Sequence, residues 1–225
     1  MTYNIIASGS DGNATIINGV VLIDCGVPMV KLRPYAKDLK LVLLTHSHGD
    51  HFNTSTVRSL ARMRPSLRWA CCPWMVEKLI AANVSERVID VFELGHGGWY
   101  NGIGSVMPQQ IPHNVPNCCW KFEDGQESLF YATDCGSLDG VEAKDYDLYL
   151  VESNHSRIDL EIRAREKEQA GEYAYEIKAA ENHLSHEQAI DWLAKNMGPR
   201  SLWIPMHQHR NKERSENNGQ NQGNA

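Results

Sequence analysis

The chain has 225 residues, of which 42% are hydrophobic and 22% are charged, a composition typical of a globular protein with a buried core. This composition excludes collagen-like, fully disordered and coiled-coil proteins. With 22 Lys and Arg against 28 Asp and Glu, the formal net charge of -6 excludes a generally basic surface that coats nucleic acid, although it allows a local basic groove.

Targeting signals and cysteine spacing indicate a cellular compartment. Residues 1–4 lack a basic stretch followed by a long apolar run, and no segment approaches the ~20 apolar residues of a membrane span. We therefore expect a cytoplasmic protein with no membrane partner. The six cysteines form two adjacent pairs and two single positions without a CxxC spacing, so we interpret them as free thiols.

Short β-rich segments dominate the first half of the chain. Strands are predicted at 3–7, 14–17 and 20–24, and Asn18-Gly19 indicates a type I′ turn. Residues 41–44 form an apolar run that is too short for a helix and suits a strand buried on both faces. Helices are predicted from Asn53 or Thr54 to about Arg64, and from Pro73 to Ala82.

The second half combines strands with two helices. Strands are predicted at 87–92, 103–107, 118–122, 128–132 and 148–152. Residues 157–180 are charged and alanine-rich with few apolar anchors, which predicts a partly packed helix. A helix over 185–195 and a strand over 201–204 follow. Residues 211–225 contain no aromatic and no large aliphatic residue, so we expect a disordered tail after a single domain spanning 1–210.

Three of the ten histidines lie together in one loop. Directly after the 41–44 strand, the chain reads Thr45-His46-Ser47-His48-Gly49-Asp50-His51. Residues two apart in an extended loop project the same way, so His46 and His48 can bind one metal ion while Asp50 and His51 turn toward a second. A solvent-exposed polar loop is the alternative interpretation.

Two divalent ions need more ligands than one loop supplies, and His or Asp residues follow three later strands. His113, Asp134 and His207 each lie just past a strand-like segment, where α/β proteins place their active sites. Each of them alone could be a surface or capping residue. Taken with the loop, they predict a metal centre.

These residues resemble a known family. The loop is similar to the HxHxDH signature of the metallo-β-lactamase superfamily, and the whole series resembles its binuclear ligand set over about residues 3–210. The resemblance implies an α/β (α+β) fold, the four-layer αββα sandwich of two mixed sheets with helices outside. It implies one ion on His46, His48 and His113, a second on Asp50, His51 and His207, and a bridging Asp134. Zinc is the first choice because most ligands are imidazoles, and manganese is the second.

Shorter matches resemble the YycJ-type branch, relatives of the tRNA-processing ribonuclease Z. They lie at residues 7–14, 112–114, 152–155 and 183–185. That branch is associated with nuclease activity, including DNA exonuclease activity. In the ribonuclease Z pattern a histidine before a small hydroxyl residue protonates the leaving group and helps to bind phosphate, which implies His183 as proton donor and Ser185 as a substrate contact. Ser185 with Gln188 also forms a capping-box pattern.

Further residues are predicted around the metal ligands. We expect Asp11 and Asn13, in a tight turn, and Asp24 to support the ligands, with Asp24 orienting a metal-bound histidine. His209 and Arg210 lie just beyond the last ligand, where they could contact a substrate phosphate.

The leading hypothesis is a metal-dependent phosphodiesterase with nucleic acid or a small nucleotide as substrate, in which a hydroxide bridging the two ions attacks phosphorus. Asp50 would also accept the water proton, and His183 would donate a proton to the departing oxygen. One alternative is a thioester or lactone hydrolase of the glyoxalase II or lactonase kind. Another is a non-catalytic protein that binds nucleic acid or nucleotide. The sequence leaves the oligomeric state open.

Overall fold

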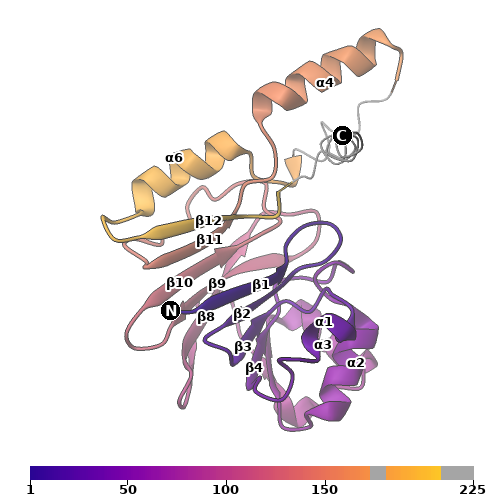
Figure 1. The fold of residues 1–225 in the computed structure, drawn as a ribbon, viewed down its shortest axis with the longest axis vertical. Helices are drawn as coiled ribbons and strands as arrows, with labels where there is room; N and C mark the ends of the chain where they lie inside the picture. The colour runs from indigo at the N-terminus through magenta and orange to yellow at the C-terminus, as the bar shows by residue number, and fades with distance from the viewer. Residues whose placement is uncertain (173–180, 209–225) are drawn as a thin grey trace, which may run out of the picture.

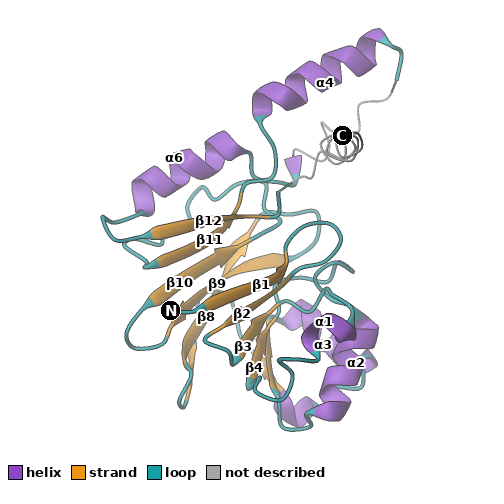
Figure 2. Cartoon of the chain, in the orientation of Figure 1, coloured by secondary structure: helices purple, strands orange, loops and turns teal. Residues whose placement is uncertain are grey.

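Two six-stranded sheets stack face to face, and helices lie outside them (Figures 1 and 2). The structure is a computed structural model that describes residues 1–172 and 181–208. Both sheets contain parallel and antiparallel pairs. The arrangement confirms the predicted α/β fold, a four-layer αββα sandwich.

The first sheet is built by the first 91 residues. Its strands follow the chain order, with β1–β3 antiparallel and β3–β6 parallel. The tight turn between β2 and β3 has positive φ at Asn18 (49°) and Gly19 (70°), as a type I′ turn requires. The strands are β1 (Tyr3–Ala7), β2 (Ala14–Ile17), β3 (Val21–Ile23), β4 (Leu41–Leu43), β5 (Arg68–Cys71) and β6 (Ile89–Val91).

The second sheet has the order β12-β11-β10-β9-β8-β7. Strands β10, β11 and β12 are parallel to one another, and β7 to β10 pair antiparallel. The strands are β7 (Gly98–Tyr100), β8 (Gly104–Ile111), β9 (Asn117–Glu123), β10 (Ser128–Ala132), β11 (Leu148–Glu152) and β12 (Leu202–Met206).

Helices cover the outer face of each sheet. The first sheet carries α1 (Met29–Leu32), α2 (Thr54–Met63) and α3 (Val76–Ala81), the last preceded by a 3-10 turn at Pro73–Met75. The second sheet carries α6 (His186–Asn196). Helix α4 (Arg157–Gln169) stands away from the sandwich at the top of Figure 1. Its exposed Ile158 and Ile162 agree with the predicted partial packing.

Three apolar layers hold these four layers of secondary structure together. Strand side chains alternate between the two faces of each sheet, so each sheet contributes to two layers. Trp120 and Tyr131 lie between the sheets, Trp69 packs under α1–α3, and Phe130 stacks on Trp192 of α6. All six cysteines are free and buried in these layers, as expected.

Most predicted elements are present within a few residues of their expected ends, and three short ones were missed. Helix α1 has four residues, and strands β5 and β7 have four and three, which is too short for a periodic pattern to identify. Residues 173–180 of the predicted 157–180 helix and the predicted tail lie outside the described residues. In the described part of the chain, no helix has the length and apolar character needed to cross a membrane.

Candidate metal centre

The predicted ligands meet at one edge of the sandwich, where strands from both sheets end. His46 follows β4, His113 follows β8, Asp134 follows β10 and His207 follows β12. Strands β8, β10 and β12 run in the same direction, so residues after them emerge at the same edge. The fold therefore gathers residues that are up to 161 positions apart in the sequence.

Left-handed backbone turns direct several of these side chains. Asp24 (φ 59°), Asp134 (φ 56°) and His207 (φ 51°) each lie one or two residues past a strand end. Residues other than glycine rarely adopt this conformation, and it recurs at functional sites where surrounding contacts enforce it. The turn bends the chain sharply at the point where the side chain must enter the site.

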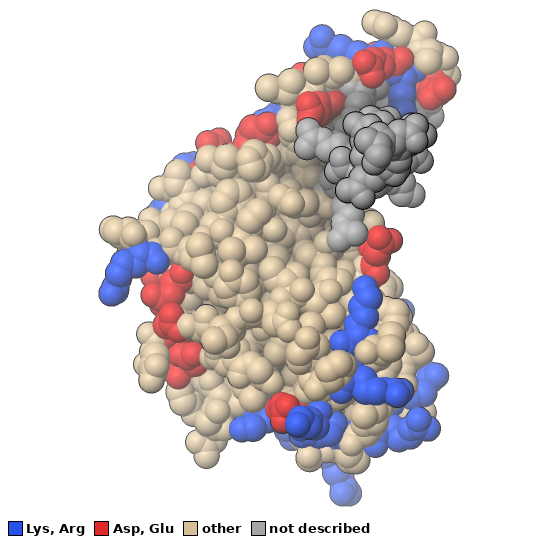
Figure 3. Space-filling model, viewed as in Figure 1, with Lys and Arg blue, Asp and Glu red and all other residues tan. Residues whose placement is uncertain are grey.

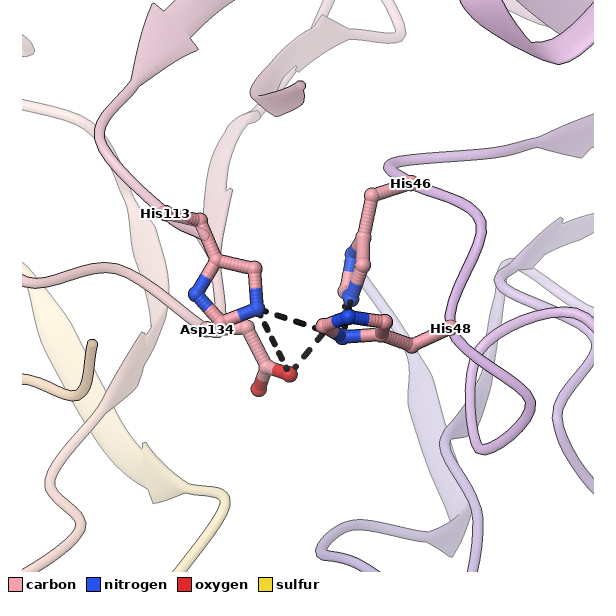
Figure 4. A group of neighbouring side chains, drawn as sticks. All are labelled: His46, His48, His113 and Asp134. Carbon is pink, nitrogen blue, oxygen red and sulfur yellow. Dashed lines mark hydrogen bonds and ion pairs between the residues drawn. The ribbon is translucent and has the colours of Figure 1, made fainter. Parts of the chain in front are cut away.

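One group of four side chains converges in Figure 4. His48 Nδ1 lies 3.2 Å from His46 Nε2 and 3.3 Å from His113 Nε2. Asp134 Oδ2 lies 3.5 Å from His46 Nε2 and 3.8 Å from His113 Nε2. One donor atom from each residue thus faces a common point, as in a four-ligand metal site.

A second group shares Asp134 with the first. Asp134 Oδ2 lies 3.3 Å from His51 Nε2, and Asp50 Oδ2 lies 3.8 Å from the same nitrogen and 3.9 Å from His207 Nε2. The structure therefore brings all seven predicted ligands together, in the two groups that the family resemblance implies, with Asp134 in both.

A buried carboxylate orients His51. Its Nδ1 donates to Asp24 Oδ2 at 2.7 Å, which leaves Nε2 facing the second group. Asp24 also accepts from the backbone N–H and the hydroxyl of Thr45, each at 3.0 Å. Asp24 thus contacts both the ring and the start of the ligand loop, the position in which a supporting residue was predicted.

The rings of His113 and His207 are oriented in the same way. His113 Nδ1 donates to the carbonyl of Asn182 at 3.1 Å, and His207 Nδ1 donates to Glu152 Oε1 at 3.0 Å. In a neutral imidazole, a donating Nδ1 leaves a lone pair on Nε2. Both rings therefore offer Nε2 to the centre.

The tight turn predicted to support the ligands contributes one of its two expected residues. Asn13 is buried, its amide nitrogen lies 2.8 Å from His51 Nε2, and its backbone N–H donates to the carbonyl of Asp50. Asp11 is exposed and has no hydrogen-bond partner among residues 1–172 and 181–208. Gly26 also supports the loop, because a Cβ there would lie 1.7 Å from the carbonyl oxygen of Asp50.

His183 and Glu152 form a third group of possible metal ligands with Asp134 and His207, and sequence reasoning did not place Glu152 there. His183 Nδ1 donates to Glu152 Oε1 at 2.7 Å, the oxygen that also accepts from His207. The other oxygen, Oε2, accepts the backbone N–H groups of Cys135 and Leu184. A carboxylate at the end of the wholly buried strand β11 was the available sequence signal, because a buried charge needs partners.

Of the remaining predicted substrate contacts, the structure describes Ser185 alone. The Ser185 hydroxyl is buried and caps α6, where it accepts the N–H of Gln188 in a complete capping box. His209 and Arg210 lie outside the described residues.

Burial and neighbouring charges shift the pKa values of the ligands. Burial raises the pKa of Asp134, but the charge of His51 and contacts with His46 and His51 outweigh it and hold this pKa well below its usual range. Burial lowers the pKa of His113 to about 4. Burial also lowers the pKa of His207, but contacts with Asp50 and Glu152 outweigh it and raise the value to about 9.

The donor set fits divalent metal ions. The buried Nε2 of His207 has no hydrogen-bond partner among the described residues, and a buried polar atom without a partner is costly. Several imidazole nitrogens face one another and one carboxylate at 3–4 Å, an arrangement that a cation between them would satisfy. Mostly imidazole ligands with two carboxylates suit zinc, and manganese also accepts carboxylates.

Comparisons with known proteins agree with this geometry. A family model described as "Beta-lactamase superfamily domain" matches residues 20–207. The exodeoxyribonuclease WalJ of Streptococcus pneumoniae (serotype 2, strain D39) is 26% identical over 223 residues, which cover 90% of this chain and 79% of WalJ.

Solved structures share the fold at low sequence identity. The metallo-beta-lactamase fold protein YhfI from Bacillus subtilis has a TM-score of 0.69 at 15% identity, over 92% of this chain and 86% of YhfI. The short form of human tRNase Z has a TM-score of 0.67 at 15% identity, over 93% of each chain. The family match spans every predicted metal ligand, and the chain therefore belongs to the beta-lactamase superfamily domain family.

Proposed function

We propose that the protein is a dinuclear metal-dependent phosphodiesterase that acts on nucleic acid. The observation that carries the proposal is the pair of ligand groups that share Asp134, with the His183–Glu152 pair directly beside the second group. The donor atoms of each group lie within 4.8 Å of one another, as ligands of one ion must.

The first group, His46, His48 and His113, and the second group, Asp50, His51 and His207, would each hold one divalent ion, with Asp134 bound to both. Zinc is the first choice. Two ions so held would supply an activated water and neutralise charge on the attacked phosphate. The protein fixes the ligand rings in advance through Asp24, Glu152 and the Asn182 carbonyl.

Asp50 is suited to accept a proton from the attacking water. Burial raises its pKa, but its contact with His207 and the charge of His51 lower it below the usual value, so the carboxylate is ionised at neutral pH. Its side chain is 23% exposed, which leaves an oxygen accessible from solvent.

His183 is suited to protonate the departing oxygen. Glu152 accepts from His183 Nδ1, and this contact fixes the ring so that Nε2 is the nitrogen left to act on a substrate. Burial raises the pKa of Glu152, but hydrogen bonds from His183 and His207 outweigh it and keep the carboxylate ionised. The His183 side chain is 21% exposed, so a substrate can reach it.

This proton donor favours phosphodiesters over thioesters. A sugar hydroxyl leaves as a strongly basic alkoxide unless it is protonated, whereas a thiolate is stable near neutral pH. The name of the relative WalJ, exodeoxyribonuclease, supports nucleic acid as the substrate class.

A hydrolysis screen of the zinc- or manganese-loaded protein tests the proposal. We expect cleavage of bis(p-nitrophenyl) phosphate and of DNA or RNA, and no turnover of S-lactoylglutathione or a homoserine lactone. The His46→Ala, His48→Ala double variant should be inactive. The matched control is His96→Ala, which alters an exposed histidine between β6 and β7 and should keep full activity. Inactivity of the loaded wild-type protein toward every phosphodiester would refute the proposal.

A further inference from the structure

Positive charge is concentrated in one part of the chain. Residues 29–87 contain ten of the 22 Lys and Arg residues but four of the 28 Asp and Glu residues. This part therefore carries +6 in a chain whose formal net charge is -6. In Figure 3 blue side chains gather at the lower right, over the helices that cover the first sheet, while red ones gather along the left margin and the two colours are mixed at the top.

Most of these cations are free to meet an external anion. Arg68 is paired with Asp90, and Arg64 donates to the carbonyl of Ala36. The eight cations other than Arg64 and Arg68 are exposed and have no ion-pair partner in the described part of the chain, although the Arg58 guanidinium also donates to the carbonyl of Ala81 at 3.5 Å. They are Lys31, Arg33, Lys37, Lys40, Arg58, Arg62, Lys78 and Arg87. Uncompensated cations on one face create a positive potential that attracts polyanions.

Helix α2 presents two of them in a row. Its buried side consists of Thr56, Val57 and Leu60, so Arg58 and Arg62 lie on the opposite, solvent-facing side. Four residues correspond to about 6 Å along a helix axis, and positions i and i+4 share one face. The two guanidinium groups can therefore contact successive anionic groups along the helix.

Helix α1 and the segment after it add further cations beside this row. Helix α1 packs against α2, and it carries the exposed Lys31, with Arg33 directly after it. At the far end of α2, Arg64 reaches the Ala36 carbonyl, which places the exposed Lys37 beside that end. We call the surface formed by Lys31, Arg33, Lys37, Arg58 and Arg62 the basic face.

The two helices that carry the basic face begin beside the ligand loop. Helix α2 starts at Thr54, three residues after His51, and is capped by Asn53. The segment leading to α1 lies against the same loop, because Cys25 N–H donates to the His51 carbonyl at 2.9 Å and the Thr56 hydroxyl donates to the Val27 carbonyl at 2.8 Å. Both helices thus run away from the ligand loop.

Segments packed on the other sheet have the opposite charge. Residues 133–152 and 181–208 contain nine Asp and Glu residues against three Lys and Arg residues. Exposed acidic residues follow β10, precede α6 and lie within it: Asp139, Glu142, Glu181 and Asp191. A polyanion leaving the metal centre would be repelled on that side and attracted along α1 and α2.

We propose that the phosphate backbone of a polynucleotide runs along the basic face, so that the substrate is a chain extending several nucleotides from the scissile bond rather than a small cyclic nucleotide. This inference rests on the proposed function, because it assigns a direction to a strand whose cleaved diester lies at the metal centre. The continuity of the cations with the ligand loop favours a polynucleotide over an acidic protein partner.

The salt dependence of binding measures these contacts. A protein that contacts Z phosphates of a single strand loses affinity with salt at a slope of about -0.7Z in a double logarithmic plot. The variant Arg58→Gln, Arg62→Gln removes two cations from exposed positions and keeps good helix-forming residues. The control Lys195→Gln, Arg200→Gln removes the same charge from exposed positions at the end of α6 and beyond it. Thermal unfolding of each variant checks that the fold is intact.

Binding is measured with the metal-loaded protein and a long phosphorothioate-linked strand, which resists cleavage. The Arg58→Gln, Arg62→Gln variant should reduce the slope by about 1.4 units, because two contacts are lost. The control variant should leave the slope unchanged. Hydrolysis of bis(p-nitrophenyl) phosphate should be the same in all three proteins, while kcat/KM for a long strand falls in the Arg58→Gln, Arg62→Gln variant alone.

Three results would overturn the inference. The first is an unchanged slope in the Arg58→Gln, Arg62→Gln variant, and the second is an equal fall in the slope of the control, which would indicate an effect of bulk charge. The third is absence of polynucleotide affinity in the wild type, which would leave the basic face for an acidic protein. Loss of the proposed function looks different, because the wild type would then cleave no diester, whatever the binding slopes are.

Discussion

The two ligand groups are built from similar residues but supported differently. In the second group, His51 and His207 donate to the buried carboxylates of Asp24 and Glu152. In the first group, His113 donates to a neutral backbone carbonyl. A carboxylate partner makes a ring a stronger ligand than a carbonyl does. We therefore expect the second group to hold its proposed ion more firmly than the first group does.

The largest expected effect comes from removing the ligand that the two groups share. Asp134→Asn should weaken binding of both ions and lower phosphodiester hydrolysis by at least about a thousandfold, more than the loss of a single stabilising donor. Metal analysis after gel filtration and steady-state kinetics measure both effects. Asp139→Asn, an exposed carboxylate nearby, is the control. Retention of one ion at full affinity would mean that Asp134 serves one group alone.

His183 should affect the leaving group rather than the metals. His183→Gln should lower cleavage of a polynucleotide by about a hundredfold and cleavage of bis(p-nitrophenyl) phosphate much less, because p-nitrophenolate departs without a proton. Metal content should stay at the wild-type value. An equal loss on both substrates would assign His183 to metal binding or structure instead of proton donation.

The two groups should also respond oppositely to pH in the metal-free protein. The folded-state pKa of His207 is raised to about 9. Its contribution to the free energy of unfolding is therefore complete below the unfolded pKa of about 6.5 and is lost as pH rises through 9. The folded-state pKa of His113 is lowered to about 4, so stability falls as pH drops from 6.5 toward 4. For His207 the full change is about 3 kcal/mol in the free energy of unfolding.

Urea unfolding with a chelator present, repeated across pH, measures these two limbs. His207→Gln should flatten the alkaline limb and leave the acidic limb, and His113→Gln should do the reverse. A wild-type profile without an alkaline decline would contradict the carboxylate support assigned to the second group.

A smaller effect should follow from weakening one support of the second group. Asp24→Asn keeps the shape of the side chain but loses its charge, so zinc affinity of the second group should fall about 10- to 100-fold. Competition with a chromophoric chelator measures each affinity. The control Asp38→Asn alters an exposed carboxylate after α1. If the zinc affinity of the first group fell instead, the expectation that Asp24 supports the second group would be wrong.

The sequence identified the seven converging residues better than the residues that support them. The loop from His46 to His51 carries a local pattern, and His113, Asp134 and His207 follow apolar runs, so both signals can be read without the fold. The supporting residues depend on which side chains of a turn point toward the metal centre. Asn13 turns inward and Asp11 outward in the same loop, and the sequence treats them alike.

Glu152 shows the other limit of sequence reasoning. Its partners, His183 and His207, lie 31 and 55 residues away, and only the packing of β11 beside β12 and the segment before α6 brings them together. Short elements were missed for a related reason. Helix α1 and strands β5 and β7 are defined by their neighbours rather than by a repeating pattern.

The most direct test of the central claim is a zinc titration of the metal-free protein, with bound metal and phosphodiester hydrolysis followed together. Two groups that share Asp134 predict two zinc ions per chain. The first equivalent of zinc should fill the second group, and hydrolysis should rise mainly as the later, weaker equivalent fills the first group. Saturation at one ion with full activity, or two bound ions without hydrolysis of any phosphodiester, would contradict the account.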